Sequence, residues 1–219
     1  MVKLHPAVIA LGSNIGGSSL ILQGRLVRGL RHLPTFGIRL VSLSEPYQTP
    51  AFPPGAGGVF VNAAALVAFS GPVGGLLAAL HRIEAGQGRV RRTRWSARTL
   101  DLDVIDAGGV ILPNRQVLRS WMELPLDAQR TRVPDRLLLP HPRAHERSFV
   151  IRPLLDVAPG WQHPVLGRSG RALLRDCPAA DRNSVLRLAP VQGWRALQAQ
   201  AKEQRARSKD LQFVHRLVR

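Results

Sequence analysis

The stretch that decides the fold is Arg94–Asp106, RWSARTLDLDVID, in which apolar residues alternate with aspartates. Successive side chains of a strand point to opposite faces, so Leu102 and Val104 are predicted to face a core while Asp101 and Asp103 share the other face. Two neighbouring carboxylates repel each other unless a divalent cation lies between them. Carboxylate oxygens, completed by water and phosphate oxygens, are ligands that suit Mg²⁺. The stretch therefore predicts a strand that serves a core and a metal site at once.

Arginines surround this pair of aspartates. Arg94 and Arg98 precede it, and a guanidinium is a planar cation that grips phosphate oxygens with two hydrogen bonds. The alternative interpretation is an edge strand with a solvated face and chance arginines. If the arginines are functional, they predict a polyphosphate beside the metal.

The composition allows one domain, or one domain with an appendage. The chain has 219 residues, of which 45% are hydrophobic, and its formal charge is 31 − 14 = +17. Only Lys3, Lys202 and Lys209 are lysines, so arginine carries most of the charge. Such a balance favours anionic partners, although a general bias toward arginine produces the same excess.

The sequence predicts a cytoplasmic, soluble protein. Cys177 is the single cysteine, so no disulfide within the chain is possible and a reducing compartment suits it. The apolar run at residues 7–11 is too short for a signal sequence or a membrane span, and we expect no membrane partner.

Hydrophobic periodicity predicts four strands and three principal helices. The strands are expected at residues 7–11, 38–42, 60–69 and 99–106, and the helices at 18–32, 72–83 and 146–157. Their order is strand–helix–strand–strand–helix–strand, which is typical of ferredoxin-like α+β folds. Residues 48–58 are expected to form a loop, and Gly108 and Gly109 to turn the chain into a hairpin with residues 110–112.

Two segments fall outside this scheme. Residues 113–133 are polar and flanked by prolines, and are expected to form an insertion loop. Residues 171–219 form a basic extension with a helix from Gln192 to Arg207. The apolar stripe of that helix consists only of Trp194, Leu197 and Ala201, so it is expected to be peripheral or partly disordered. We therefore divide the chain into a catalytic domain at 1–170 and an extension at 171–219.

A series of short motifs runs along the chain in a specific order. They are Leu11–Asn14, Ser44–Pro50, Phe60–Ala64, Arg82–Glu84, Gly88–Arg91, the aspartate strand, Leu139–Pro142 and Arg147–Val150. Together they resemble the 6-hydroxymethyl-7,8-dihydropterin pyrophosphokinase family of folate biosynthesis over about residues 7–165. The resemblance implies a ferredoxin-like βαββαβ sandwich with an antiparallel sheet.

The resemblance also implies a reaction. Pyrophosphate passes from ATP, the co-substrate, to the hydroxymethyl group of 6-hydroxymethyl-7,8-dihydropterin, and AMP is released. Two Mg²⁺ ions are expected at Asp101 and Asp103, and two metals can clamp the attacking and leaving oxygens. We expect a monomer or weak dimer whose partners are these small molecules.

The nucleotide side of the site follows from the same resemblance. Arg89 and Arg98 are expected to touch the transferred phosphates and to be catalytic together with the two aspartates. Arg94 and Trp95 are expected in a mobile lid that excludes water. The remaining nucleotide contacts are expected from Glu84, Arg136, His141 and Arg147. For Glu84, an ion pair with a nearby arginine is an equal alternative.

The pterin is a flat heterocycle that needs apolar faces and a polar rim. Phe149 and Phe60 are the candidates for the faces, although Phe60 also fits a core position. Asn62 offers a donor and an acceptor to the ring edge. The set of expected pterin contacts is Gly12, Thr49, Phe52, Phe60, Asn62 and Phe149.

The sequence departs from the family in one place. The arginine-rich loop looks one residue shorter, and Ser96-Ala97 stands where Gly-Pro is usual. A competing hypothesis is an RNA-binding domain, because basic ferredoxin-like sheets recur among RNA binders. With 5% aromatic residues the chain has few stacking platforms, so nucleic acid is expected only as a non-specific partner of the basic extension. A third possibility makes that extension an interaction module for another enzyme or for RNA.

Overall fold

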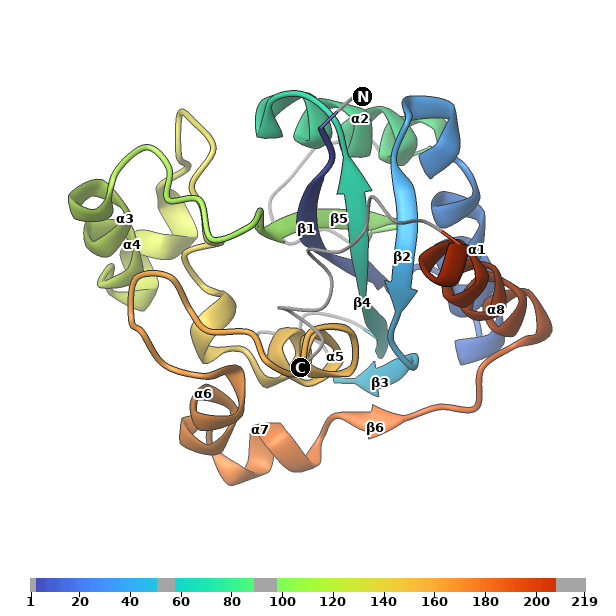
Figure 1. The fold of residues 1–219 in the computed structure, drawn as a ribbon. Coiled ribbons are helices and arrows are strands. Elements are labelled where there is room, and N and C mark those ends of the chain that lie inside the picture. Colours follow the sequence, from blue (N-terminus) through green and yellow to red (C-terminus); the bar gives the residue numbers. More distant parts are fainter. Residues whose placement is uncertain (1–2, 51–57, 89–97, 208–219) are drawn as a thin grey trace.

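A computed structural model describes residues 3–50, 58–88 and 98–207. Its centre is an antiparallel sheet in which β1 (His5–Ser13) lies between β5 (Asp101–Asp106) and β4 (Phe60–Phe69). Two strands pair with the other edge of β4: β2 (Arg39–Leu43) along one half and β3 (Tyr47–Thr49) along the other. The short β6 (Leu186–Arg187) then pairs with β3 (Figure 1).

Two helices connect the strands in the expected order. α1 (Ser19–Arg31) links β1 to β2, with the 3-10 turn η1 (Leu33–Phe36) after it, and α2 (Val73–Gly86) links β4 to β5. The spatial order β5-β1-β4-β2 is that of a ferredoxin-like sheet, so the predicted fold class is confirmed. Gly37 ends η1 with a φ of 69°, a left-handed conformation that glycine adopts at no steric cost.

One face of the sheet, which we call the packed face, is covered by α1, α2 and α8 (Gln192–Arg207) (Figure 1). Ile9 of β1 and Leu102 of β5 point into this layer, where they meet Leu26 of α1 and Leu80 of α2. All four side chains are almost completely buried. The main hydrophobic core of the molecule lies here.

The helix predicted at residues 192–207 is confirmed, but its expected peripheral position is wrong. Trp194, Leu197 and Ala201 are all buried and belong to the main core. The indole Nε1 of Trp194 donates to the backbone oxygen of Ser44 at 3.0 Å. A stripe that looks thin in the sequence is thus sufficient, because β2 and α1 provide a groove that receives it.

The other face, which we call the open face, is covered mainly by α5 (Ser148–Val157). Ile151 and Leu154 of this helix pack against Val8 and Leu66 of the sheet. Three small elements follow or precede α5: η2 (Ala144–Glu146), α6 (Gly170–Asp176) and α7 (Ala179–Asn183). α5 leaves one end of the sheet uncovered, and the cavity described below lies there.

Residues 113–133 are not the loop that the sequence predicted. They contain α3 (Arg115–Met122) and α4 (Leu126–Thr131), which project beyond the end of β5 (Figure 1). The predicted hairpin at 107–112 is also wrong, since residues 110–111 form no strand and Leu112 makes only an isolated bridge to Leu139. Among the described residues, no helix combines the length and apolar character needed to cross a bilayer.

Candidate active site

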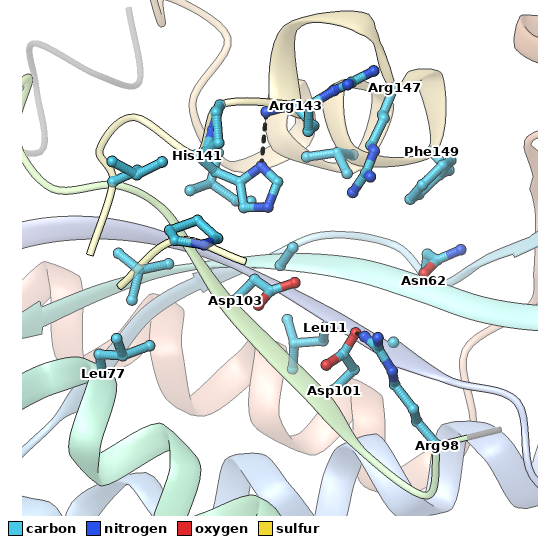
Figure 2. Close-up of a pocket in the computed structure, with 18 of the residues that line it drawn as sticks. Leu11, Asn62, Leu77, Arg98, Asp101, Asp103, His141, Arg143, Arg147 and Phe149 are labelled. Carbon is cyan, nitrogen blue, oxygen red and sulfur yellow. Dashed lines mark hydrogen bonds and ion pairs between the residues drawn. The ribbon is translucent and has the colours of Figure 1, made fainter. Parts of the chain in front are cut away.

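A cavity of about 650 Å³ lies on the open face, a size typical of small-molecule sites. Its floor is the sheet, and its roof is the segment 141–150, which includes the start of α5 (Figure 2). α2 and the α3–α4 segment contribute side chains at one end. Residues far apart in the sequence therefore meet around one space.

The sheet register places three expected site residues in one row. Gly12 of β1 pairs with Asp101 of β5 on one side and with Asn62 of β4 on the other. Neighbouring strands are about 4.8 Å apart, so the carboxylate and the amide belong to positions roughly 10 Å apart across the sheet. A Cβ at residue 12 would lie 3.2 Å from Asn62 Oδ1, so a side chain at this position would crowd the Asn62 amide.

The two carboxylates lie on the face that the alternation predicted. Leu102 and Val104 are buried in the packed face, whereas Asp101 and Asp103 are partly exposed and line the cavity. The Arg98 guanidinium contacts Asp101 Oδ2. Burial alone would lower the pKa of Arg98, but the charges of Asp101 and Asp103 outweigh it and the pKa is raised.

His141 is fixed through its backbone and through one ring nitrogen. Its backbone N–H donates to the backbone oxygen of Ile105 at 2.8 Å, and its ring Nδ1 accepts from the backbone N–H of Arg143 at 3.1 Å (Figure 2). Burial, followed by the charge of Arg147, lowers the pKa of His141 to about 3. The imidazole is therefore neutral at pH 7, and with Nδ1 as acceptor its proton resides on Nε2.

Arg147 stands directly before α5, and Phe149 is the second residue of the helix. The Arg147 guanidinium carbon lies 5.8 Å from the centroid of the Phe149 ring. Burial lowers the pKa of Arg147, while Asp103 and Asp101 oppose the shift. Figure 2 shows the Arg147 side chain extending from the roof toward the aspartates, with Phe149 facing Asn62.

The end of the cavity around Asn62 is polar and narrow. Asn62 Nδ2 donates to Thr49 Oγ1 at 2.7 Å, and both side chains are buried. Phe60, half-buried, is paired with Thr49 in the sheet and lines the same space as Phe149. The expected pterin contacts Gly12, Thr49, Phe60, Asn62 and Phe149 are therefore brought together.

Glu84 lies apart from the other predicted nucleotide contacts that the structure describes. Its side chain is buried, it is not among the residues that line the cavity, and Oε1 accepts the backbone N–H of Leu102 at 2.7 Å. This carboxylate supports β5 from the packed face, and its charge contributes to the raised pKa of Arg98. The sequence left Glu84 between a nucleotide contact and an ion pair with an arginine. Its described hydrogen bond goes to the β5 backbone instead, and the nucleotide contact stays a prediction.

The remaining predicted residues lie at the rim or outside the described part of the chain. Arg136 lines the cavity but is exposed, and its guanidinium is paired with the carboxylate of Asp135. The positions of Arg89, Arg94, Trp95 and Phe52 lie outside the described residues.

Several lining residues were missed by the sequence analysis. Arg143 belongs to the roof, and burial followed by the charge of Arg147 lowers its pKa to about 10. Its place two residues after His141 was a usable signal. Trp121 and Arg132 of the α3–α4 segment also line the cavity, but nothing in a stretch interpreted as a loop indicated that they would converge there.

Comparison with known proteins gives one family. Residues 8–159 match the model of the 7,8-dihydro-6-hydroxymethylpterin-pyrophosphokinase family. A 2-amino-4-hydroxy-6-hydroxymethyldihydropteridine pyrophosphokinase of Methylorubrum extorquens is 35% identical over 154 residues, which are 70% of this chain and 82% of that protein. The enzyme of the same name from Pseudomonas aeruginosa is 36% identical over 170 residues, 78% of this chain and 90% of its own length.

Solved structures support the fold. Wild-type HPPK-DHPS of Plasmodium falciparum superposes with a TM-score of 0.52 at 14% identity, over 80% of this chain and 45% of that one. A triple mutant of the same protein with pteroate gives a TM-score of 0.55 at 15% identity, over 80% and 41%. This chain thus spans less than half of those longer proteins, and the likeness concerns the fold alone.

Proposed function

We propose a place for each reactant on the premise that this chain belongs to the 7,8-dihydro-6-hydroxymethylpterin-pyrophosphokinase family. The protein is an ATP-dependent pyrophosphokinase of folate biosynthesis. It transfers pyrophosphate from ATP to the hydroxymethyl group of 6-hydroxymethyl-7,8-dihydropterin and releases AMP. Membership of this enzyme family also removes the reason for the competing RNA-binding hypothesis. The observation that carries the proposed site is the row Asp101–Gly12–Asn62 across three strands.

Two Mg²⁺ ions are proposed at Asp101 and Asp103. The donors fit this metal: two carboxylates share one open sheet face, and Mg²⁺ typically takes one or two carboxylates together with substrate phosphates. When bound, Mg²⁺ supplies charge that stabilises the phosphoryl oxygens during transfer.

The phosphates of ATP are proposed to lie between the aspartates and the roof. Arg98 from the floor and Arg147 from the roof approach this space from opposite sides (Figure 2). His141 adds a neutral N–H donor at Nε2, because its Nδ1 is already occupied as an acceptor. We assign Arg136 a weaker contact from the rim, and Arg89, Arg94 and Trp95 keep the roles that the family resemblance implies, as proposals.

The pterin is proposed to lie between Phe60 and Phe149, with its polar edge on Asn62. The amide of Asn62 is fixed by Thr49, so it is preorganised to present its oxygen to a ring N–H. Gly12 leaves room for the ring beside the sheet. Phe52 is proposed for the same subsite. A pterin held here projects its hydroxymethyl group along the row toward Asp101.

The transfer requires alignment more than covalent help from the protein. The hydroxymethyl oxygen forms a bond to the β-phosphorus, the bond from that phosphorus to the α-phosphate oxygen breaks, and AMP leaves with that oxygen. The hydroxyl proton passes to solvent. Arg98 and Arg147 offset the negative charge on the transferred group, and the roof over the cavity limits the access of water as a competing nucleophile.

We also propose that the enzyme acts in the cytoplasm, as a monomer or weak dimer. Its single cysteine is a buried free thiol, which agrees with a reducing compartment.

Two variants test the site from opposite ends. Asp103→Asn removes a metal-binding charge without changing side-chain size, and we expect AMP formation to fall by about three orders of magnitude or more, with pterin affinity changed less than threefold. Asn62→Ala removes the ring-edge contact, and we expect the dissociation constant of the pterin to rise about tenfold or more, with ATP affinity retained. Near-native turnover of the Asp103→Asn enzyme would reject the metal assignment.

A further inference from the structure

The part of the cavity farthest from Asn62 is formed by the α3–α4 arm, defined here as residues 113–135. Trp121, Leu124 and Arg132 of this arm line the cavity, and Leu77 and His81 of α2 lie on the same lining. Figure 2 shows Leu77 on one side of Asp103, while Asn62 and Phe149 lie on the other. The cavity therefore has three zones: a polar end with aromatic faces, a charged middle, and a second end that is mostly apolar.

The arm is docked on the rest of the molecule by its own small core. Leu118 of α3 is fully buried against Leu138 and Val165, and Trp121 packs against this cluster. Arg115 NH1 donates to the backbone oxygen of Val165 at 3.1 Å. Because Leu138 directly precedes the segment that carries His141, the arm and the roof of the charged zone share one support.

The hinge of the arm is fastened by backbone hydrogen bonds. Leu112 and Leu139 exchange two of them, at 2.9 and 3.1 Å. At the start of α3, the Asn114 side chain caps the helix by accepting from the N–H of Val117 at 2.9 Å. These contacts fix where the arm places its side chains relative to the aspartates.

The chemistry of this zone suits a flat heterocycle. The Arg132 guanidinium carbon lies 5.5 Å from the centroid of the Trp121 ring, so a cation and an aromatic face are stacked at the lining. Leu77 and Leu124 add aliphatic surface. Such a set offers stacking and apolar contact to a purine, and the guanidinium offers N–H donors to the acceptor nitrogens at the edge of the base.

We propose that the α3–α4 arm binds the base of the nucleotide through Trp121 and Arg132, and that it is a specificity-determining element of this enzyme. The inference rests on the proposed function, which places the phosphates in the charged middle and the pterin at Asn62. The adenosine part of ATP is then left for the zone that the arm lines. The arm holds the base at a distance from the reacting atoms, so its contribution goes to binding and not to the transfer step.

The test compares two polyphosphates that differ in the base. Inorganic tripolyphosphate carries the charges of the ATP tail but has no adenosine. With Mg²⁺ present, we expect Trp121→Leu to raise the dissociation constant of ATP about tenfold, and Arg132→Gln to raise it about threefold to fivefold. The affinities for tripolyphosphate and for the pterin should stay within twofold of the wild type.

Arg119→Gln is the matched control. Arg119 belongs to α3, is exposed and does not line the cavity, so its loss removes the same charge from the same arm. Both affinities should stay unchanged in this variant. Trp121 packs against the arm's small core, so its replacement could disturb folding of the arm. Arg132 is exposed and lies outside that core, so Arg132→Gln tests the base contact without this effect.

Three results would overturn the inference. Unchanged ATP affinity in both variants would remove the arm from the base site. If the affinities for ATP and for tripolyphosphate fall equally, the variants act through a general loss of charge or through collapse of the arm. A wild-type enzyme that binds ATP no more tightly than tripolyphosphate would show that the base is not recognised. If that enzyme still forms AMP, the proposed pyrophosphokinase function is unaffected. Absence of AMP formation by the wild type would instead refute the proposed function, and this inference with it.

Discussion

The two faces of the sheet are made from the same strands but are occupied differently. On the packed face, three helices seal the apolar side chains of β1, β4 and β5 from water. On the open face, α5 seals only part of the sheet, and the uncovered end carries Asp101, Asp103 and Asn62. Alternation along a strand therefore lets one element contribute to stability with every second residue and to chemistry with the others. The predictions below test whether the two contributions are separate.

The largest effect is expected for Trp194→Ala on the packed face. Its side chain is fully buried and its indole N–H donates to the Ser44 carbonyl. Its removal therefore leaves a cavity and takes one donor from that carbonyl, which keeps its bond from Gln198 Nε2. We expect the free energy of unfolding to fall by about 3–5 kcal/mol, measured by urea denaturation. Truncation before α8 should prevent stable folding for the same reason.

Lys202→Ala is the control for this loss. Lys202 is exposed on the same helix, next to the buried Ala201, and its replacement should change the free energy of unfolding by less than about 0.5 kcal/mol. A soluble, stable and active truncation at residue 170 would show that the packed face does not need α8.

Leu102→Ala tests the two faces of a single strand. Leu102 is buried between two partly exposed aspartates, and we expect its truncation to cost about 2–5 kcal/mol of stability. At a temperature where the variant remains folded, its turnover number should stay within about threefold of the wild type. Asp103→Asn should give the opposite pair of results, with lost turnover and little lost stability. A Leu102→Ala enzyme that is stable but inactive would show that the faces are coupled.

The free energy of unfolding is expected to depend on pH through one buried histidine, His163. His163 is fully buried beyond α5, and burial together with the nearby His145 lowers its pKa to about 4. A lowered pKa means that the unfolded chain binds the proton more readily. Stability is therefore fully present above about pH 6.5 and is lost as the pH falls toward 4. From pH 7 to pH 5 this group should remove about 2 kcal/mol of unfolding free energy.

His163→Gln measures that contribution directly. The variant does not titrate in this range, so its stability at pH 7 and pH 5 should differ by correspondingly less than that of the wild type. Urea denaturation at the two pH values gives the comparison. An unchanged pH dependence in the variant would assign the acid sensitivity to other groups, such as His141, whose pKa is also lowered.

The smallest effect is expected for Glu84→Gln, which separates support from ligand binding. The amide oxygen can still accept the N–H of Leu102, so the cost in stability should be about 1 kcal/mol. The KM for ATP should remain within twofold of the wild type, because Glu84 does not line the cavity. A KM raised tenfold without a change in stability would return Glu84 to the nucleotide site.

The sequence predicted those parts of the molecule that depend on local periodicity or on an ordered set of motifs. The alternation in β5 placed Asp101 and Asp103 correctly on the face opposite Leu102, because strand geometry alone decides it. The central strand β4 was predicted with its observed bounds, 60–69. The convergence of Gly12 and Asn62 with the aspartates followed from the family resemblance and not from periodicity.

The features that the sequence did not predict depend on contacts between residues far apart in the chain. The burial of Trp194 depends on the groove between β2 and α1, and no local pattern describes that groove. The turn at Gly108 and Gly109 was read correctly, but the chain after it leaves the sheet and returns only as the bridge between Leu112 and Leu139. Trp121 was overlooked because a lining residue is defined by what it faces across a space, and not by its neighbours in the chain.

The hydrogen bond between Trp194 and Ser44 joins residues 150 positions apart. During synthesis, the strand that ends near Ser44 leaves the ribosome long before α8 does. Until α8 arrives, the growing chain has no cover for that part of its apolar sheet, and such exposed surface favours aggregation and chaperone binding. The burial of this part of the sheet therefore depends on α8, a helix far downstream of the strands that it covers.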